Sequence, residues 1–142
     1  MKELLNLALS YYGLKEFPGK KHNEVIVNFS KEIGHSWVNT DETAWCSIFI
    51  NFLAKKCDYE SSGKLNARSW LDVGFEPCEK EIGDIVVLWR ESKTSWKGHV
   101  GLFIRETDKY IYVLGGNQGN AVNIKPYLKS RLLQYRRLNK NK

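Results

Sequence analysis

Three side chains in this sequence have the chemistry of a nucleophilic site: Cys46, His99 and Asn117. A cysteine attacks a carbonyl carbon as a thiolate, so it needs a base nearby that accepts the thiol proton. Histidine suits that role near neutral pH, and a polar neighbour must hold its ring in one tautomer. If the fold brings the three together, they predict acyl transfer through a covalent thioester.

Cys46 begins an apolar segment, "WCSIFINFLA", directly after the polar run "TDET" at residues 40–43. Asp41 or Thr43 can cap a helix here, which would place Cys46 within its first two turns. The unpaired N–H groups and the helix dipole at that end favour a thiolate and can hold an oxyanion. A free cysteine more often simply packs in a core, so position alone leaves both interpretations open.

His99 and Asn117 are the candidates for the base and for its orienting partner. His99 follows Gly98 at the start of a predicted strand, where its ring can project from the end of a sheet. In "LGGNQGNAVNI" two glycines let the chain bend and re-aim the next side chain, so Asn117 can accept a hydrogen bond from His99. The alternatives are an ordinary strand-end histidine and a glycine-rich turn, and only the combination points to a site.

Four further residues are candidate substrate contacts. Trp45 adjoins the cysteine and Trp96 precedes the histidine in a loop, so either indole can flank a peptide or a sugar. Both indoles can also be explained by packing in the core or in a loop, and for Trp45 we prefer that explanation. Asp41 and Gln118 can contact the amino groups and amides of a peptide.

Three cysteines, Cys46, Cys57 and Cys78, are too few and too widely spaced for a disulfide scaffold. Their odd number leaves at least one free thiol. No CxxC pair exists and no cluster of metal ligands stands out, so we expect neither a metal nor another cofactor.

The first half of the chain is predicted to be helical. Apolar residues recur at helical spacing over residues 4–12 and 25–33, and a third helix should run from about residue 41 to residue 56. The third helix is the least amphipathic and should be the most buried. The segment "NARSWLDVG" predicts a short fourth helix that ends at Gly74.

After Pro77 the pattern changes to strands. "GDIVVLW" is a compact β-branched run, and "GHVGLFIRE" places Val100, Leu102 and Ile104 on one face and His99 on the other. A Thr-Asp turn, "YIYVLGG", "AVNI" and "RLLQYRRL" complete an antiparallel meander. Helices followed by such a sheet predict one α+β domain over residues 1–142, with the helices on one face or end of the sheet.

The net charge of +6 favours an anionic partner such as nucleic acid, an acidic membrane or a wall polymer. Much of the excess lies in the C-terminal segment, which includes Lys125 and Arg131, and a solvated basic face explains it equally well. No nucleic-acid-binding motif accompanies the charge, and no apolar run is long enough to span a bilayer. We therefore expect no nucleic-acid partner and no stable membrane insertion.

The N-terminal segment reads as an amphipathic helix and not as a signal peptide. We expect synthesis in the cytoplasm and action on the cell wall or in the periplasm after delivery by another system.

The segments "WCSIFINF", "GDIVVLWR", "GHVGLFI" and "VLGGNQGNAVNI" occur in an order and spacing that resembles the CHAP superfamily. These are small papain-like cysteine- and histidine-dependent amidohydrolases and peptidases, related to NlpC-type cell-wall hydrolases. The resemblance covers residues 14–138, and "KEFPGKKHN" and "ARSW" resemble the branch found in phage lysins and bacterial wall hydrolases. It implies a papain-like fold with Cys46 as nucleophile, His99 as base and Asn117 as orienting residue, a position that varies among relatives.

The resemblance also implies a function, which is hydrolysis of an amide bond in peptidoglycan stem peptides by a monomeric single-domain enzyme. An immunity or holin-type protein is a further partner to test. Whether the enzyme is an amidase or an endopeptidase stays open. Two alternatives also stay open: a binding module that keeps the fold without catalysis, and an acyltransferase that uses the same three residues with an amine acceptor.

Overall fold

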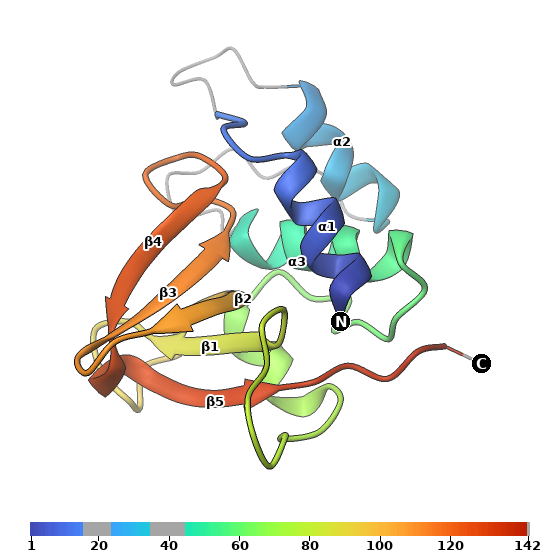
Figure 1. The fold of residues 1–142 in the computed structure, drawn as a ribbon. Helices are drawn as coiled ribbons and strands as arrows, with labels where there is room; N and C mark the ends of the chain where they lie inside the picture. The colour runs from blue at the N-terminus through green and yellow to red at the C-terminus, as the bar shows by residue number, and fades with distance from the viewer. Residues whose placement is uncertain (16–23, 35–44, 142) are drawn as a thin grey trace.

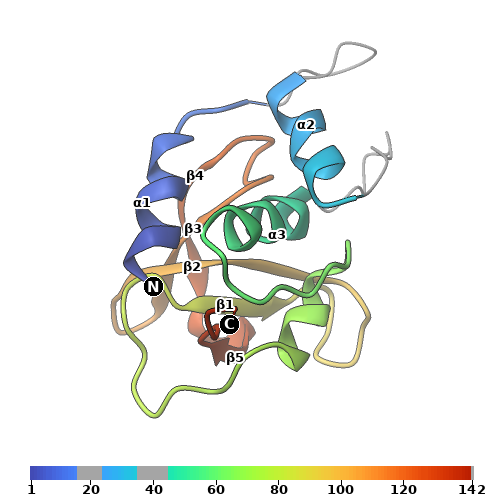
Figure 2. The ribbon, with the colours of Figure 1, turned by 90° about the vertical axis from the view of Figure 1, so that its right-hand side faces the viewer.

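The computed structural model describes residues 1–15, 24–34 and 45–141. Within these residues the fold is α+β, as the sequence predicts, with helices gathered on one side of an antiparallel sheet (Figures 1 and 2). The helices are α1 (Lys2–Ser10), α2 (Glu24–Glu32) and α3 (Trp45–Lys56). No helix in the described part of the chain is both long enough and apolar enough to cross a membrane.

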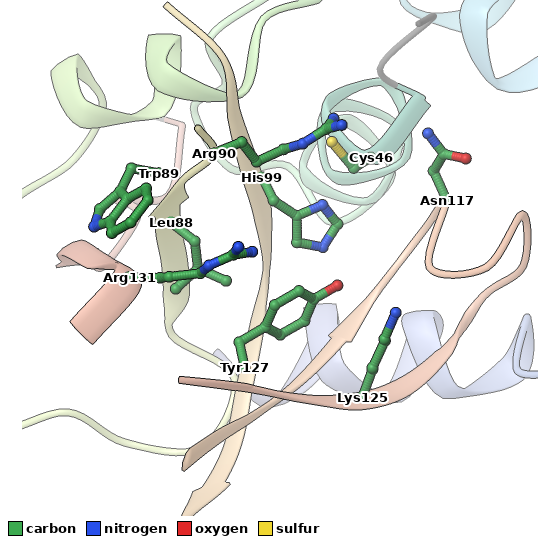
Figure 3. Close-up of a pocket in the computed structure, with 9 residues that line it drawn as sticks. All are labelled: Cys46, Leu88, Trp89, Arg90, His99, Asn117, Lys125, Tyr127 and Arg131. Carbon is green, nitrogen blue, oxygen red and sulfur yellow. The ribbon is translucent and has the colours of Figure 1, made fainter. Parts of the chain in front are cut away.

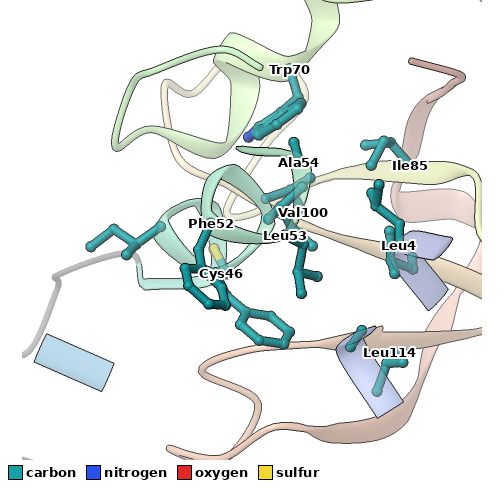
Figure 4. Close-up of a cluster of buried hydrophobic side chains, with 14 of the residues drawn as sticks. Leu4, Cys46, Phe52, Leu53, Ala54, Trp70, Ile85, Val100 and Leu114 are labelled. Carbon is teal, nitrogen blue, oxygen red and sulfur yellow. The ribbon is translucent and has the colours of Figure 1, made fainter. Parts of the chain in front are cut away.

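The central helix is α3, and every residue from Trp45 to Ala54 is buried. It lies between α2 and the sheet, with Phe29 of α2 packed against Phe52 and Phe49, while α1 lies beside it and also contacts β3 (Figure 2). The prediction that this helix is the most buried is confirmed. Figure 4 shows part of the cluster that surrounds it, in which Val100 and Leu114 come from the sheet.

The predicted fourth helix is not an α-helix. Residues Ala67–Asp72 form a 3₁₀ helix, η1, between two residues with extended backbone, Asn66 and Val73. The segment is only six residues long and Trp70 within it is fully buried, and short connectors of this kind favour the tighter 3₁₀ form. The Ser69 hydroxyl donates to the carbonyl oxygen of Asn66, which fixes the first turn.

The five strands in the described residues form one antiparallel sheet with the order β4-β3-β2-β1-β5. The strands are β1 (Ile85–Trp89), β2 (Gly98–Glu106), β3 (Tyr110–Gly115), β4 (Asn123–Leu128) and β5 (Leu132–Arg136). The first four form the predicted meander, but β5 does not continue it. It returns by the short 3₁₀ helix η2 (Lys129–Arg131) to pair with β1 at the opposite edge (Figure 1).

This return has a physical reason, because the second face of the sheet is also apolar. Val86, Leu88, Phe103, Ile111 and Val113 form a second buried cluster on that face. Side chains of β4 and β5, Tyr127, Leu132 and Tyr135, pack against the cluster and cover it. The predicted alternation along β2 is therefore confirmed: Val100, Leu102 and Ile104 face the helices, and Phe103 faces the second cluster.

A buried ion pair fixes the C-terminal segment to the start of β1. The Asp84 carboxylate is fully buried and accepts hydrogen bonds from Nε and Nη2 of Arg137, both at 2.8 Å. The backbone N–H of Glu81 donates to the same carboxylate at 2.7 Å. Bidentate pairing and a third donor satisfy the acceptor capacity that makes a buried carboxylate tolerable.

Candidate functional site

The structure brings the three predicted catalytic residues to one pocket. Cys46, His99 and Asn117 all line a cavity of about 240 Å³ (Figure 3). Cys46 is the second residue of α3, His99 is the second residue of β2, and Asn117 lies just after β3. The three residues are far apart in the sequence, so their meeting is a property of the fold.

A buried polar network holds the first turns of α3 in place. The Ser47 hydroxyl donates to the carbonyl oxygen of Lys64 at 2.7 Å and accepts from the indole N–H of Trp70 at 3.0 Å. One turn later, the Asn51 amide donates to the same carbonyl at 2.9 Å. Cys46 is therefore mounted on a turn that is tied to η1 and to the segment before it. The sequence signal for this network is a pair of polar residues spaced by four within an apolar helix.

Two glycines, Gly115 at the end of β3 and Gly116 directly after it, permit close approach to both His99 and α3. A Cβ on Gly116 would lie 2.8 Å from the Trp45 ring, nearer than real Cβ contacts allow. A Cβ on Gly115 would lie 2.7 Å from Oε1 of Gln118 and 3.4 Å from Nε2 of His99. Side chains at these positions would push the segment away from the pocket.

The hydrogen-bond partner of His99 is Gln118. Nε2 of His99 lies 2.9 Å from Oε1 of Gln118. The amide nitrogen of Gln118 lies 3.1 Å from the carbonyl oxygen of Val113 and 2.7 Å from that of Asn123. Carbonyl oxygens only accept, so this end of the amide must be the NH₂ group and the oxygen must face the ring. His99 therefore carries its proton on Nε2, and Nδ1 keeps a free lone pair.

This places the orienting hydrogen bond one residue beyond the predicted one. Asn117 has a positive φ of 58°, a left-handed conformation that turns the chain at this point. The side chain of Gln118 consequently turns back to His99, while Asn117 lines the pocket. Gln118 is only 2% exposed and its amide is engaged within the protein, so it holds this position in place of the expected substrate contact. In a strand, alternation predicts which side chains point to which face, but no such rule applies in a glycine-rich turn, so the sequence does not show whether Asn117 or Gln118 contacts His99.

The remaining predicted contacts are distributed differently. Trp45 is buried in the core, which agrees with its structural interpretation. Trp96 is 69% exposed in the loop between β1 and β2 and does not line the pocket. Arg68 anchors this loop by donating to the carbonyl oxygens of Lys97, Lys93 and Ser92, and a role for Trp96 stays a prediction. Asp41 lies outside the described residues.

Burial sets the protonation states of the two reactive groups. It lowers the pKa of His99 to about 4, and the positive charges of Arg90 and Lys125 act in the same direction, whereas the hydrogen bond to Gln118 opposes them. Burial raises the pKa of Cys46, and the backbone N–H groups of Val100 and Ser47 and the charge of Arg90 only partly offset this effect.

The resting site therefore holds a neutral thiol and a neutral imidazole. The helix-end argument predicts a thiolate, and desolvation of a side chain that is 3% exposed outweighs it. Within the described residues no hydrogen bond joins the sulfur of Cys46 to His99, although Figure 3 shows the ring beside the sulfur. Nucleophilic attack by Cys46 would therefore require its proton to be transferred to a base during the attack.

The far wall of the pocket was not identified from the sequence. The Tyr127 ring stacks on His99 with 5.1 Å between centroids and 29° between planes. Arg90, Lys125 and Arg131 line the pocket around this pair. Lys125 and Tyr127 are two residues apart on β4 and so share one face of the strand. This spacing is the feature of the sequence that could have predicted that the two side chains line the same pocket.

The chemistry of the site stands on these residues. A thiol at the start of a helix, an imidazole with a fixed tautomer and a basic wall are groups that could carry out acyl transfer. Among the described residues no group of three or more histidine, cysteine or acidic side chains is arranged to hold a metal ion. Comparison with protein-family models finds no match for this chain, and comparison with curated proteins finds none either.

Proposed function

We propose that this chain is a papain-like cysteine hydrolase that cleaves an amide bond in peptides of the bacterial cell wall. The observation that carries the proposal is the fixed tautomer of His99. The Gln118 amide leaves Nδ1 as the acceptor on a ring that shares a pocket with Cys46. With the proton on Nε2 directed at Gln118, Nδ1 is the ring nitrogen that can accept the proton of Cys46.

In the proposed reaction Nδ1 of His99 takes the thiol proton as the sulfur of Cys46 bonds to the substrate carbonyl carbon. The tetrahedral intermediate collapses, the C–N bond breaks, and the amine leaves with the proton from His99. The product of this half is a thioester on Cys46. Water then attacks the thioester with His99 as base, which releases a carboxylic acid and restores the thiol.

Two features of the site can stabilise the oxyanion. The backbone N–H of Cys46 belongs to the first turn of α3, where N–H groups have no acceptor within the helix. The positive charge of Arg90 already acts on the sulfur, so it also acts on charge that develops at the adjacent carbonyl. Both remain in place when the substrate binds, so they require little reorganisation.

Wall peptides are the proposed substrate class for two reasons. The sequence resembles the CHAP superfamily, whose members cleave peptidoglycan amides, and the net charge of +6 favours binding to an anionic polymer. Amidase and endopeptidase cleavage use the same acyl chemistry. The site residues are therefore compatible with either bond.

Digestion of purified sacculi, followed by mass spectrometry of the released fragments, tests the proposal. The wild-type protein should release fragments whose masses identify the bond, and His99→Ala should release none while keeping the far-UV circular dichroism spectrum of the folded protein. Intact sacculi after prolonged incubation with folded wild-type protein would contradict the proposal.

One observation favours a second candidate, a binding module without catalysis. The thiol of Cys46 is protonated and has no hydrogen bond to His99 within the described residues. Such a module would sediment with sacculi, and His99→Ala would sediment equally well. Release of new amino or carboxyl groups by the wild-type protein excludes this candidate.

A further inference from the structure

We propose that the pocket beside Cys46 recognises a carboxylate, so that the substrate carries a free carboxyl group close to the bond that is cleaved. The statement about a substrate rests on the proposed function. The preference of the pocket for a carboxylate does not, because it concerns only the charge of the molecule that enters. The basis is a set of three cations, Arg90, Lys125 and Arg131, which line the same cavity as the sulfur and the imidazole.

The three cations come from different parts of the fold. Arg90 follows β1, and its backbone N–H donates to the carbonyl oxygen of Lys97. Lys125 belongs to β4, and Arg131 ends η2. Figure 3 shows all three around His99 and Tyr127. Convergence of separate elements distinguishes this set from a run of solvated charges along one segment.

The positive charges act on the reactive groups themselves. Arg90 shifts the pKa of Cys46, His99 and Tyr127, in each case toward the form that suits a neighbouring cation. Lys125 acts on His99 in the same way, and Arg131 acts on Tyr127. An anion in the pocket would therefore experience all three charges together.

Within the described residues these charges are not neutralised. None of the described ion pairs involves Arg90, Lys125 or Arg131, whereas Lys80, Lys97 and Arg137 are all paired with carboxylates. No acidic side chain of the described residues lines the pocket. The pocket thus concentrates positive potential without an internal counter-charge.

Two of the cations lie near aromatic rings that line the same pocket. The guanidinium of Arg131 lies 5.5 Å from the centre of the Trp89 ring, and Nζ of Lys125 lies 6.0 Å from the centre of the Tyr127 ring. The Trp89 ring is held in turn by its N–H, which donates to the carbonyl oxygen of Ser130 at 2.9 Å. Such contacts restrict where the cations lie and leave their polar groups available to a ligand.

A carboxylate is the ligand that this chemistry selects. Guanidinium groups bind carboxylates through paired N–H donors, and an ammonium group adds a point charge. Peptide substrates carry carboxylates at acidic side chains and at chain ends. A peptide with a carboxyl group near its scissile amide would place it within this pocket while the carbonyl meets the sulfur.

Alkylation of Cys46 by two matched reagents tests this directly. Both reagents, iodoacetate and iodoacetamide, react at their CH₂ carbon: the S–C bond forms as the C–I bond breaks, iodide leaves and the thiol proton goes to His99 or solvent. Iodoacetate adds a carboxymethyl group and iodoacetamide a carbamoylmethyl group, so the two differ only by a carboxylate against a carboxamide. The measurement is the ratio of the two rates at Cys46, determined by peptide mass spectrometry. A small neutral thiol gives the reference ratio. Because both reagents meet the same sulfur, its burial and its pKa cancel in the ratio.

We expect the ratio of iodoacetate to iodoacetamide rates at Cys46 to exceed that of the reference thiol about tenfold at low salt. Arg90→Gln, Lys125→Gln and Arg131→Gln should each lower it about threefold, and added salt should also lower it. Lys109→Gln is the matched control, because it removes one exposed positive charge at the β2–β3 turn, and its ratio should equal that of the wild-type protein. Cys78 should show a lower ratio than Cys46, since Glu76 and Glu79 line its pocket, where Lys80 is paired with Glu106.

A wild-type ratio equal to the reference, or an equal fall in the Lys109→Gln control, would overturn the inference. If neither reagent modifies Cys46, titration with succinate and with its diamide gives the same discrimination. Succinate should shift the ring-proton NMR signals of His99 and Tyr127 and the diamide should not, and identical effects of the two would overturn the inference.

A failure of the proposed function looks different. If the wild-type protein shows the raised ratio but releases nothing from sacculi, the carboxylate site is supported and the proposed hydrolase function is wrong. If it hydrolyses sacculi but shows the ratio of the reference thiol, the hydrolase function is supported and the carboxylate site is wrong. If Arg90 serves only the oxyanion, Arg90→Gln will slow carboxylate and carboxamide substrates equally, which would remove Arg90 from the carboxylate site.

Discussion

Oε1 of Gln118 accepts a hydrogen bond from Nε2 of His99, and the amide that provides this oxygen is itself held by two backbone carbonyls. Those carbonyls decide which end of the amide faces the ring, and the amide decides which nitrogen of the ring keeps a proton. The backbone carbonyls of Val113 and Asn123 therefore fix the tautomer of His99, with the proton on Nε2 and a free lone pair on Nδ1.

Gln118 and Asn117 should differ sharply when each is removed. Gln118→Ala should lower kcat for amide release about a hundredfold, because His99 loses its fixed tautomer. Asn117→Ala should lower kcat much less, since the described hydrogen bond to the ring comes from its neighbour. Rates of amine release from a wall peptide measure both.

A spectroscopic readout separates orientation from a loss of structure. The ¹⁵N chemical shifts of His99 should report a proton on Nε2 in the wild-type protein and a mixture of tautomers in Gln118→Ala. If the shifts are unchanged in Gln118→Ala, or if Asn117→Ala loses more kcat than Gln118→Ala, then Asn117 and not Gln118 orients His99.

The stability of the protein should fall in mild acid because of His99. The unfolded chain takes up a proton near the ordinary pKa of 6.5, whereas the native ring stays neutral until about pH 4. Protons therefore favour the unfolded state between these values, so this contribution is present above pH 6.5 and is lost as the pH falls. We expect a loss of about 3 kcal/mol in the free energy of unfolding from this residue across that range.

Urea unfolding at a series of pH values measures the effect, with His99→Asn as the matched comparison. The variant lacks the titrating ring, so the curve of its unfolding free energy against pH should be flatter than that of the wild-type protein. Parallel curves for the two proteins between pH 7 and pH 4 would show that the ring is not buried in its neutral form.

Asp84 should be among the most sensitive positions for stability. Asp84→Ala leaves the Arg137 guanidinium without its buried partner, so we expect a loss of about 3–5 kcal/mol. Glu81→Ala is the control. Its carboxylate lies 3.6 Å from the same guanidinium but is largely exposed, and we expect a change below about 1 kcal/mol. Equal losses in chemical denaturation would refute the distinction.

In the resting protein, iodoacetamide should label Cys78 faster than Cys46. Rapid reaction of Cys46 with iodoacetamide looks like a simple sign of a live nucleophile. Cys46 is buried with a raised pKa, whereas Cys78 is exposed, so we expect Cys78 to react faster in the resting protein. A peptide ligand that changes the rate at Cys46 alone would still report on the site, and faster resting reaction at Cys46 would contradict these protonation states.

The sequence predicts the parts of the fold that depend on periodicity. The buried helix that carries Cys46, the two faces of β2 and the α+β order all follow from the spacing of apolar residues. The position of β5 does not, because its own residues do not reveal which edge of the sheet they join. That edge is decided by the second apolar face, which only the assembled sheet displays.

The candidate site, too, is only partly predictable from the sequence. Cys46 and His99 were identifiable because each stands at a recognisable place, the start of a helix and the start of a strand. The sequence does not reveal that Gln118 contacts His99 in place of Asn117, since one left-handed residue in a turn changes which side chain points inward. In the sequence, Lys125 and Arg131 belong to a basic C-terminal segment that gives no sign of a pocket. The fold brings them to the same pocket as Arg90.

The most direct test of the central claim compares the wild-type protein with Cys46→Ala in the clearing of purified sacculi at equal concentration. Because the thioester can form only on Cys46, the variant should lose at least about a thousandfold in rate while its unfolding midpoint stays close to that of the wild-type protein. Cys57→Ala should clear sacculi normally, as a matched removal of a thiol elsewhere. Clearing by Cys46→Ala at the wild-type rate would contradict the account.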